Sequence, residues 1–254
     1  MNGDVQLVAS VPDAFADLVE GTTAGHTGGP FSLFLSGGPT AEKCYRRLAG
    51  RTGPGRAGDS GAGDSGAGVD WRTVDVYLGD ERCVPLDDAD SNHRMITAAL
   101  LGEVGPVHGD HPMYRSGPPE RAAAEYQALV EPLGHLDLVH LGLGPDGHCA
   151  SLFPGSTALE LADPDVLVAA SRDPNAANPH DRITLTLAAI ARARLVVFTV
   201  SGTSKHQAFA RIAAGEDLPA ARVTADRVLW LVDTAAAGDI DLSQPRSVAQ
   251  PVRG

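Results

Sequence analysis

The sequence predicts an open, mainly parallel α/β sheet with helices on both faces. Short apolar segments alternate along the chain with segments whose apolar residues recur at helical spacing. Residues 195–200, LVVFTV, form a continuous apolar run, as expected of a central parallel strand covered on both faces. A chain of 254 residues, of which 43% are hydrophobic, is also long enough to bury a sizeable core.

The elements follow one another in this alternation. We predict strands at residues 31–35, 74–78, 136–143, 195–200 and 228–232. We predict helices at residues 41–48, 95–101, 120–130 and 205–214; the first carries Ala41, Cys44, Tyr45 and Leu48 at positions i, i+3, i+4 and i+7. Ligands of such sheets bind outside the carboxyl ends of the strands. The turns that directly follow strands are therefore the expected site.

Composition restricts the class of partner. The formal net charge of −12 argues against a nucleic-acid or anionic-membrane partner, since both need a basic face. No apolar run approaches the roughly 18 residues that span a bilayer, and the first residues lack the basic and apolar regions of a signal peptide. Three widely spaced cysteines suggest no disulfide framework. We expect a cytoplasmic protein with reduced thiols, and a monomer.

Residues 52–68, TGPGRAGDSGAGDSGAG, stand apart from the rest of the chain. The pentad GDSGA occurs twice in tandem, and the segment has no large apolar residue. We therefore expect a flexible surface loop. A domain linker is the alternative, but the flanking elements look like parts of one sheet. We accordingly predict a single domain over residues 1–254 with this insertion.

The turn after the first predicted strand reads Ser36-Gly37-Gly38-Pro39-Thr40. Paired glycines allow backbone N–H groups to approach an anion, and the following helix N-terminus adds partial positive charge. The turn therefore predicts a phosphate-binding cradle, with an ordinary glycine turn and a threonine cap as the alternative. It matches neither a Walker A loop nor a dinucleotide-binding G-x-G-x-x-G motif.

Two further strand-end turns carry charged side chains. Gly79-Asp80-Glu81-Arg82-Cys83 places three charges at a strand end, which indicates either a cleft or a solvated loop. The later turn 142–151, GLGPDGHCAS, places Asp146 two residues from His148 among glycines. A carboxylate beside an imidazole orients it and supports the imidazolium, as a general base requires. The alternative is that both side chains cap the loop.

Lys205 follows the LVVFTV strand, in the first turn of the next predicted helix. A cation there is unfavourable for the helix dipole, so the lysine either faces an anion or is solvated. His140 lies inside a strand and is expected to be a packed core histidine. Ser151 lacks a nucleophile-elbow motif, and the histidines lack metal-binding spacing, so we predict neither covalent catalysis nor a metal.

Taken together and in this order, these segments resemble the 6-phosphogluconolactonase family, which shares its fold with glucosamine-6-phosphate isomerase/deaminase. The resemblance covers residues from about Phe31 to Trp230. It is carried by LSGGPT (35–40), LGDERCVP (78–85) with SNHRM (91–95), LGLGPDGHCASLFPG (141–155), DRITLTLAAI (181–190) and VSGTSKHQAF (200–209). It implies a three-layer αβα sandwich with a mainly parallel, Rossmann-like sheet, hydrolysis of 6-phosphoglucono-δ-lactone in the pentose phosphate pathway, and no cofactor.

The resemblance also implies roles for individual residues. His148 would be the general base, with Asp146 orienting it and Asp80 lining the site. The substrate phosphate would lie on the turn of Ser36, Gly37, Gly38 and Thr40, with Lys205 as its cation. Arg82 would add positive charge near the substrate. Arg182 is a further candidate for a substrate contact, and Arg172 competes with it.

The chain departs from the family pattern at several places. Pro39 stands where Ser or Thr is usual and removes one N–H donor, His93 replaces a common aromatic residue, and Cys149 replaces a frequent Thr. The region before Phe31 is short and glycine-rich, so we expect the usual first helix to be truncated. An isomerase/deaminase would carry a carboxylate in the stretch Leu152-Phe153-Pro154-Gly155, which has none. A sugar-phosphate sensor domain is the other alternative.

Overall fold

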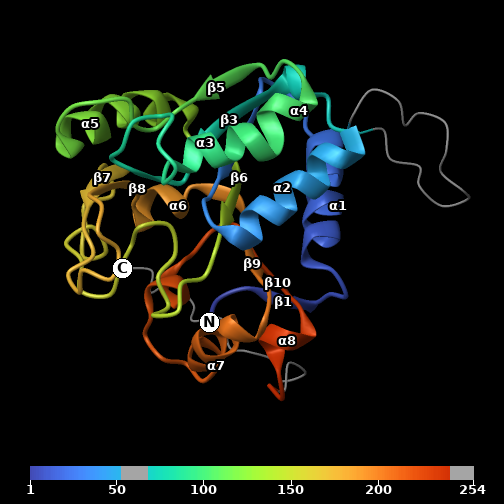
Figure 1. Cartoon of the computed structure of the whole chain (residues 1–254), viewed down its shortest axis with the longest axis vertical. Helices are drawn as coiled ribbons and strands as arrows, with labels where there is room; N and C mark the ends of the chain where they lie inside the picture. Colours follow the sequence, from blue (N-terminus) through green and yellow to red (C-terminus); the bar gives the residue numbers. More distant parts are fainter. Residues whose placement is uncertain (53–67, 241–254) are drawn as a thin grey trace, which may run out of the picture.

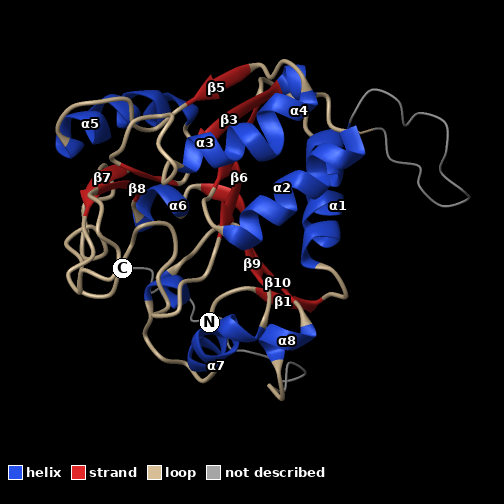
Figure 2. Ribbon diagram, in the orientation of Figure 1, coloured by secondary structure: helices blue, strands red, loops and turns tan. Residues whose placement is uncertain are grey.

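The computed structural model describes residues 1–52 and 68–240. Within these residues, seven strands form one central sheet in the order β1-β10-β9-β6-β2-β3-β5, and every neighbouring pair is parallel (Figures 1 and 2). All five predicted strands belong to it, which confirms the parallel α/β prediction. The strands are β1 (Asp4–Leu7), β2 (Phe31–Leu35), β3 (Val74–Leu78), β5 (Gly109–His111), β6 (Leu136–Leu141), β9 (Ala193–Val200) and β10 (Arg227–Val232).

Side chains on the two faces of the sheet pack against different helices, which makes the predicted three layers. On one face, the His140 ring of β6 contacts Phe15 of α1 (Val11–Ala24) and Tyr45 of α2 (Pro39–Thr52). On the other, Phe198 of β9 and Trp230 of β10 stack at 3.8 Å between ring centroids, and α7 (His206–Ala213) packs onto Trp230. None of the helices in the described ranges is long and apolar enough to span a membrane.

The remaining helices are short, apart from α5. They are α3 (Asn92–Ile96), α4 (Gly102–Val104), α5 (Pro119–Val130), α6 (Leu187–Ile190) and α8 (Thr234–Ala237). The helix predicted at 95–101 is present, but α-helical geometry ends at Ile96 and a π-helical turn, Thr97–Leu101, continues it. The helix predicted at 205–214 begins as a 3-10 turn, Thr203–Lys205, and becomes α7 at His206.

A second sheet was not predicted. Three antiparallel strands, β4 (Asp80–Arg82), β8 (Arg182–Leu185) and β7 (Val168–Ser171), pair in the order β4-β8-β7. The segment 80–82 was expected as a turn, because three consecutive charged residues lack the apolar alternation of a strand. Its pairing with β8 sets Asp80 opposite Thr184 and Arg82 opposite Arg182. The small sheet thus brings the charged residues of β4 next to Arg182 of β8, although the two strands are far apart in the sequence.

The expectation of a truncated first helix is wrong. Helix α1 has 14 residues and follows the parallel edge strand β1. Ser10 caps it by accepting a hydrogen bond from the Asp13 N–H, and Pro12 lies in its first turn. Its buried side chains, which include Phe15 and Val19, form the stripe that packs on the sheet. Of the glycines that suggested truncation, Gly25, Gly28 and Gly29 fall in the connection between α1 and β2, whereas α1 includes Gly21.

The predicted insertion at 52–68 lies outside the described residues except at its two ends. Strands β2 and β3, which precede and follow it in the chain, pair in parallel register from Phe31 opposite Val74 to Leu35 opposite Leu78. The chain therefore returns to the same sheet after the segment, as an insertion requires. A single domain over the whole chain remains a proposal.

Candidate active site

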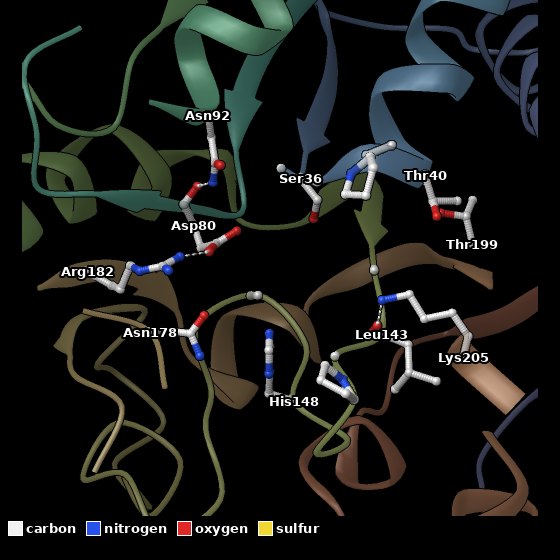
Figure 3. A pocket seen from close by; sticks show the side chains of 18 of the residues that line it. Ser36, Thr40, Asp80, Asn92, Leu143, His148, Asn178, Arg182, Thr199 and Lys205 are labelled. Atoms are coloured by element: carbon white, nitrogen blue, oxygen red, sulfur yellow. Dashed lines mark hydrogen bonds and ion pairs between the residues drawn. The ribbon is translucent and has the colours of Figure 1, made fainter. Parts of the chain in front are cut away.

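The turns after β2 and β6 and the end of β9 face the small sheet across one pocket of about 180 Å³ (Figure 3). It lies at the carboxyl ends of the central strands, as this class of sheet predicts. Nine of the ten predicted site residues line it: Ser36, Gly37, Gly38, Thr40, Asp80, Arg82, His148, Arg182 and Lys205. The tenth, Asp146, lies directly behind His148.

Two hydrogen bonds from Ser36 hold the turn after β2 in place. The Ser36 N–H donates to the Tyr45 hydroxyl at 2.8 Å, and the Ser36 hydroxyl donates to the His140 carbonyl at 2.7 Å. Ser36 therefore fixes the turn, and its hydroxyl proton is directed away from a ligand. The first α-helical bond of α2 runs from the Glu42 N–H to the Gly38 carbonyl. The amides of Thr40 and Ala41 precede it, and such first-turn N–H groups have no acceptor within the helix, which suits them to bind an anion.

The His148 ring is oriented by Asp146. Its Nδ1 lies 2.5 Å from Asp146 Oδ1, and the same oxygen accepts the His148 backbone N–H at 3.1 Å. Burial acts to raise the pKa of Asp146, but the hydrogen bond and charge of His148 outweigh it, so this pKa is lowered. An ionised carboxylate only accepts hydrogen bonds, so Nδ1 carries the proton. The lone pair of a neutral ring is then on Nε2, and the ring extends into the pocket in Figure 3.

Gly144 makes room for this ring. A Cβ at position 144 would lie 2.2 Å from both Cε1 and Nδ1 of His148, closer than any real contact. The Gly144 N–H also donates to the His148 carbonyl at 2.8 Å, which closes the turn beneath the ring. Position 144 is therefore a glycine because any side chain there would collide with the His148 ring.

Arg182 and Asp80 form a buried charged pair on the other side of the pocket. Arg182 Nη1 lies 3.8 Å from Asp80 Oδ2, which accepts the Ser151 hydroxyl at 2.6 Å. Arg182 is 6% exposed, and its Nε has no hydrogen-bond partner among the described residues. Burial lowers the pKa of Arg182, against the effect of the Asp80 charge. A buried, incompletely paired guanidinium beside a cavity is suited to an anionic ligand.

The structure separates the two competing arginines. The side chain of Arg172 is 71% exposed, pairs with Asp181 at 2.6 Å, and is not among the pocket residues. Arg182 is therefore the better candidate for a ligand contact.

Lys205 ends the 3-10 turn before α7, and its Nζ donates to the Leu143 carbonyl at 2.8 Å (Figure 3). Burial lowers the pKa of Lys205, and the Asp146 charge opposes that effect. The ammonium group thus lies at the rim shared by the β2 turn and the His148 loop, where its charge is desolvated. An anion bound there would favour its protonated form.

Three other polar residues line the pocket without having been predicted: Asn92 of α3, Thr199 of β9 and Asn178. Thr199 is the one polar residue in the apolar run LVVFTV, and this exception could have marked it as a candidate site residue. Asn92 lies in the quoted SNHRM segment. Asn178 lies in a loop held by a hydrogen bond from its Nδ2 to Asp173 Oδ2 at 2.9 Å, and no local pattern marks it.

The remaining candidate groups are structural. His140 is fully buried, as predicted, between the hydroxyls of Tyr45 and Thr199. Ser151 and Cys149 are both buried and neither lines the pocket, and burial also raises the pKa of the Cys149 thiol, so neither is placed as a nucleophile there. Over residues 1–52 and 68–240, no group of three or more His, Cys, Asp or Glu side chains is arranged to hold a metal ion.

A family model described as glucosamine-6-phosphate isomerases/6-phosphogluconolactonase matches residues 4–230. The chain belongs to this family of sugar-phosphate enzymes. It is 34% identical over 227 residues to a 6-phosphogluconolactonase of Synechocystis, covering 84% of this chain and 85% of that protein. It is 38% identical over 189 residues to a 6-phosphogluconolactonase of Mycobacterium tuberculosis, covering 68% and 75%.

Solved structures of the family agree with this fold. The crystal structure of 6-phosphogluconolactonase from Thermotoga maritima matches 91% of this chain and 100% of its own, with a TM-score of 0.76 and 28% identity. A monomeric glucosamine-6-phosphate deaminase matches 92% of this chain and 98% of its own, with a TM-score of 0.70 and 20% identity. The second likeness shows a shared fold only.

Proposed function

We propose that the chain is a 6-phosphogluconolactonase, which hydrolyses 6-phosphoglucono-δ-lactone to 6-phosphogluconate in the oxidative pentose phosphate pathway. The observation that carries this proposal is His148, with Nδ1 hydrogen-bonded to a carboxylate and Nε2 open to a pocket. The same pocket holds a glycine turn, a lysine and two arginines. The names of the relatives at 32–38% identity support the same assignment.

The phosphate end of the substrate is assigned to the turn after β2. The amides of Gly37, Gly38 and Thr40 offer N–H donors, and Lys205 supplies a charge from the rim that this turn shares with the His148 loop. Binding at this remote group would orient the lactone carbonyl toward His148.

His148 then acts as a general base. Its Nε2 takes a proton from a water molecule while the water oxygen bonds to C1 of the lactone, and the carbonyl electrons move onto oxygen. Asp146 stabilises the imidazolium through Nδ1–H. Arg82 or nearby backbone N–H groups stabilise the oxyanion. Collapse of the intermediate breaks the bond from C1 to the ring oxygen, which takes the proton back from Nε2. The reaction consumes water and needs no cofactor.

The alternatives lack a supporting observation. Amino-sugar-phosphate isomerisation needs a carboxylate-supported histidine and a base for the sugar C2, and the segment after His148 carries no carboxylate. A sensor domain would not require the pairing of Asp146 with His148. We further propose a cytoplasmic monomer, supported by three unpaired cysteines and the acidic charge.

The test is hydrolysis of freshly made 6-phosphoglucono-δ-lactone, corrected for the spontaneous rate. The wild type should exceed that rate by orders of magnitude, and His148→Ala should be at least about 100-fold slower because it lacks the base. His135→Ala is the matched control, since His135 is half-exposed and precedes β6 at the opposite end of that strand. A wild type at the spontaneous rate refutes the function. An active His148→Ala refutes the mechanism alone, and turnover of glucosamine-6-phosphate would favour the isomerase.

A further inference from the structure

Glu81 is a buried carboxylate that the proposed mechanism does not use. It lies between Asp80 and Arg82 on β4, where strand alternation directs its side chain away from theirs. It is 1% exposed and accepts four hydrogen bonds. The donors are the backbone N–H groups of Arg82 (2.7 Å), Asn92 (2.8 Å) and His93 (2.8 Å), and the hydroxyl of Ser91 (3.1 Å). Glu81 therefore fixes the start of α3 against β4.

The residue placed by these bonds is Asn92, whose side chain joins three parts of the site. Its Nδ2 donates to the Asp80 carbonyl at 2.9 Å (Figure 3), and its Oδ1 accepts from Arg82 Nη1 at 2.7 Å. It also abuts the phosphate turn: a Cβ at Gly37 would lie 2.0 Å from Asn92 Oδ1. Asn92 is 3% exposed, so its amide has little freedom to move.

Arg82 is held by neutral acceptors only. Its Nη1 donates to Asn92 Oδ1 and to the Asp90 carbonyl at 2.8 Å. In the described part of the chain it forms no ion pair with a carboxylate, whereas Arg172, Arg211 and Arg222 each do. A neutral acceptor orients a guanidinium without cancelling its charge, so the positive charge of Arg82 can still attract an anion in the pocket.

We propose that Asn92 is a positioning residue that holds Arg82 at the pocket with its charge uncompensated, and that Glu81 acts through Asn92. The proposal deepens the proposed function, and it rests on that function for the anionic ligand that Arg82 would attract. An Asp at position 92 has almost the same shape, but it would neutralise Arg82 at hydrogen-bond distance and could not donate to the Asp80 carbonyl. The same placement of Asn92 also explains the glycine at position 37.

The first test is binding of 6-phosphogluconate to the full chain, measured by titration calorimetry. Asn92→Asp should weaken binding at least tenfold, and it should also lower kcat for the lactone to the extent that Arg82 stabilises the oxyanion. Gln6→Glu is the control, because it makes the same change of charge at an exposed position on the edge strand β1. It should bind within twofold of the wild type. Binding by a folded Asn92→Asp that matches the wild type overturns the proposal.

The second test separates a positioning role from a general structural one. Asn92→Ala is made in the wild type and in an Arg82→Met background, and binding is measured in all four proteins. If Asn92 acts through Arg82, the alanine weakens binding about tenfold in the wild type and less than twofold when Arg82 is absent. Equal losses in both backgrounds overturn the proposal.

These binding tests do not depend on turnover. A wild type that binds 6-phosphogluconate but does not hydrolyse the lactone refutes the proposed function and leaves the role of Asn92 to be decided by the variants. A wild type that binds neither 6-phosphogluconate nor inorganic phosphate overturns both proposals.

Discussion

His140 should make the folded protein lose stability as the pH falls below 7. Its ring is fully buried on β6, with Nδ1 2.8 Å from the Tyr45 hydroxyl and Nε2 2.8 Å from the Thr199 hydroxyl. Burial lowers the pKa of His140 from 6.5 to about 3. The unfolded chain therefore binds a proton near pH 6.5 that the folded chain excludes until about pH 3. The contribution to stability is complete above the unfolded pKa and is lost as the pH falls toward 3.

The size of this effect follows from the two pKa values. Each unit of pH between them changes the free energy of unfolding by about 1.4 kcal/mol. Going from pH 7 to pH 5 crosses only the unfolded pKa, so the loss is about 2 kcal/mol. Other histidines and carboxylates also titrate in this range, so the measurement needs a variant that removes this group alone. His140→Gln keeps a side chain that can donate and accept but does not titrate.

The assay is urea unfolding of the wild type and His140→Gln at pH 7 and pH 5. The variant should be less stable at pH 7, and the difference between the two proteins should shrink by about 2 kcal/mol at pH 5. Contributions from all other groups cancel in this double difference. A stability difference that stays constant between the two pH values would refute the reasoning, because it would show that His140 binds its proton equally in both states.

Two further predictions concern the pocket. Gly144→Ala should lower kcat about 100-fold with a small change in KM, because the new Cβ displaces the His148 ring. Steady-state kinetics on the lactone checks this prediction. An unchanged kcat would mean that the position of the ring is not critical. Arg182→Met should weaken 6-phosphogluconate binding by roughly 10- to 100-fold, which is the value of a charge-assisted hydrogen bond. Arg172 forms an exposed ion pair outside the pocket, so the affinity of Arg172→Met should stay within about twofold of the wild-type affinity. Calorimetry on the two variants distinguishes them, and the reverse order would reassign the contact to Arg172.

The parts of the fold that were predicted correctly carry strong local signals. Strands β2, β3, β6, β9 and β10 are apolar runs followed by turns, and α2 and α5 show helical spacing. The misses have local causes. Helix α1 has a Ser10 cap, Pro12 and an apolar stripe, but the glycines after it suggested that the region was too short. Strand β4 consists of three charged residues, and only its pairing with β8 makes it a strand.

Several predicted site residues lie in turns whose place in the fold follows from the order of strands along the chain. A turn that follows a parallel strand must lie at the carboxyl edge of the sheet, so Gly38, His148 and Lys205 were expected to meet there. Asn178 lies in a loop whose path depends on tertiary contacts such as the bond to Asp173, and no local pattern predicts those. Thr199 lines the pocket from β9, the neighbour of the central strand β6, while its hydroxyl lies 2.8 Å from His140 Nε2; both relations depend on the order of strands in the sheet and not on the local sequence.

The small sheet explains why both arginines line one pocket. Arg82 and Arg182 are register partners across β4 and β8, and like charges directly opposite each other destabilise an antiparallel pair. The charge of Arg82 contributes to lowering the pKa of Arg182, after burial as the main cause. Asp80 lies near enough to offset part of this repulsion, and Asn92 holds Arg82 without offsetting any of it. An anionic ligand between the two guanidinium groups would remove the remaining repulsion. If the proposed function holds, a bound anion would reduce the repulsion across the β4–β8 pair, which would favour the bound state over the free one.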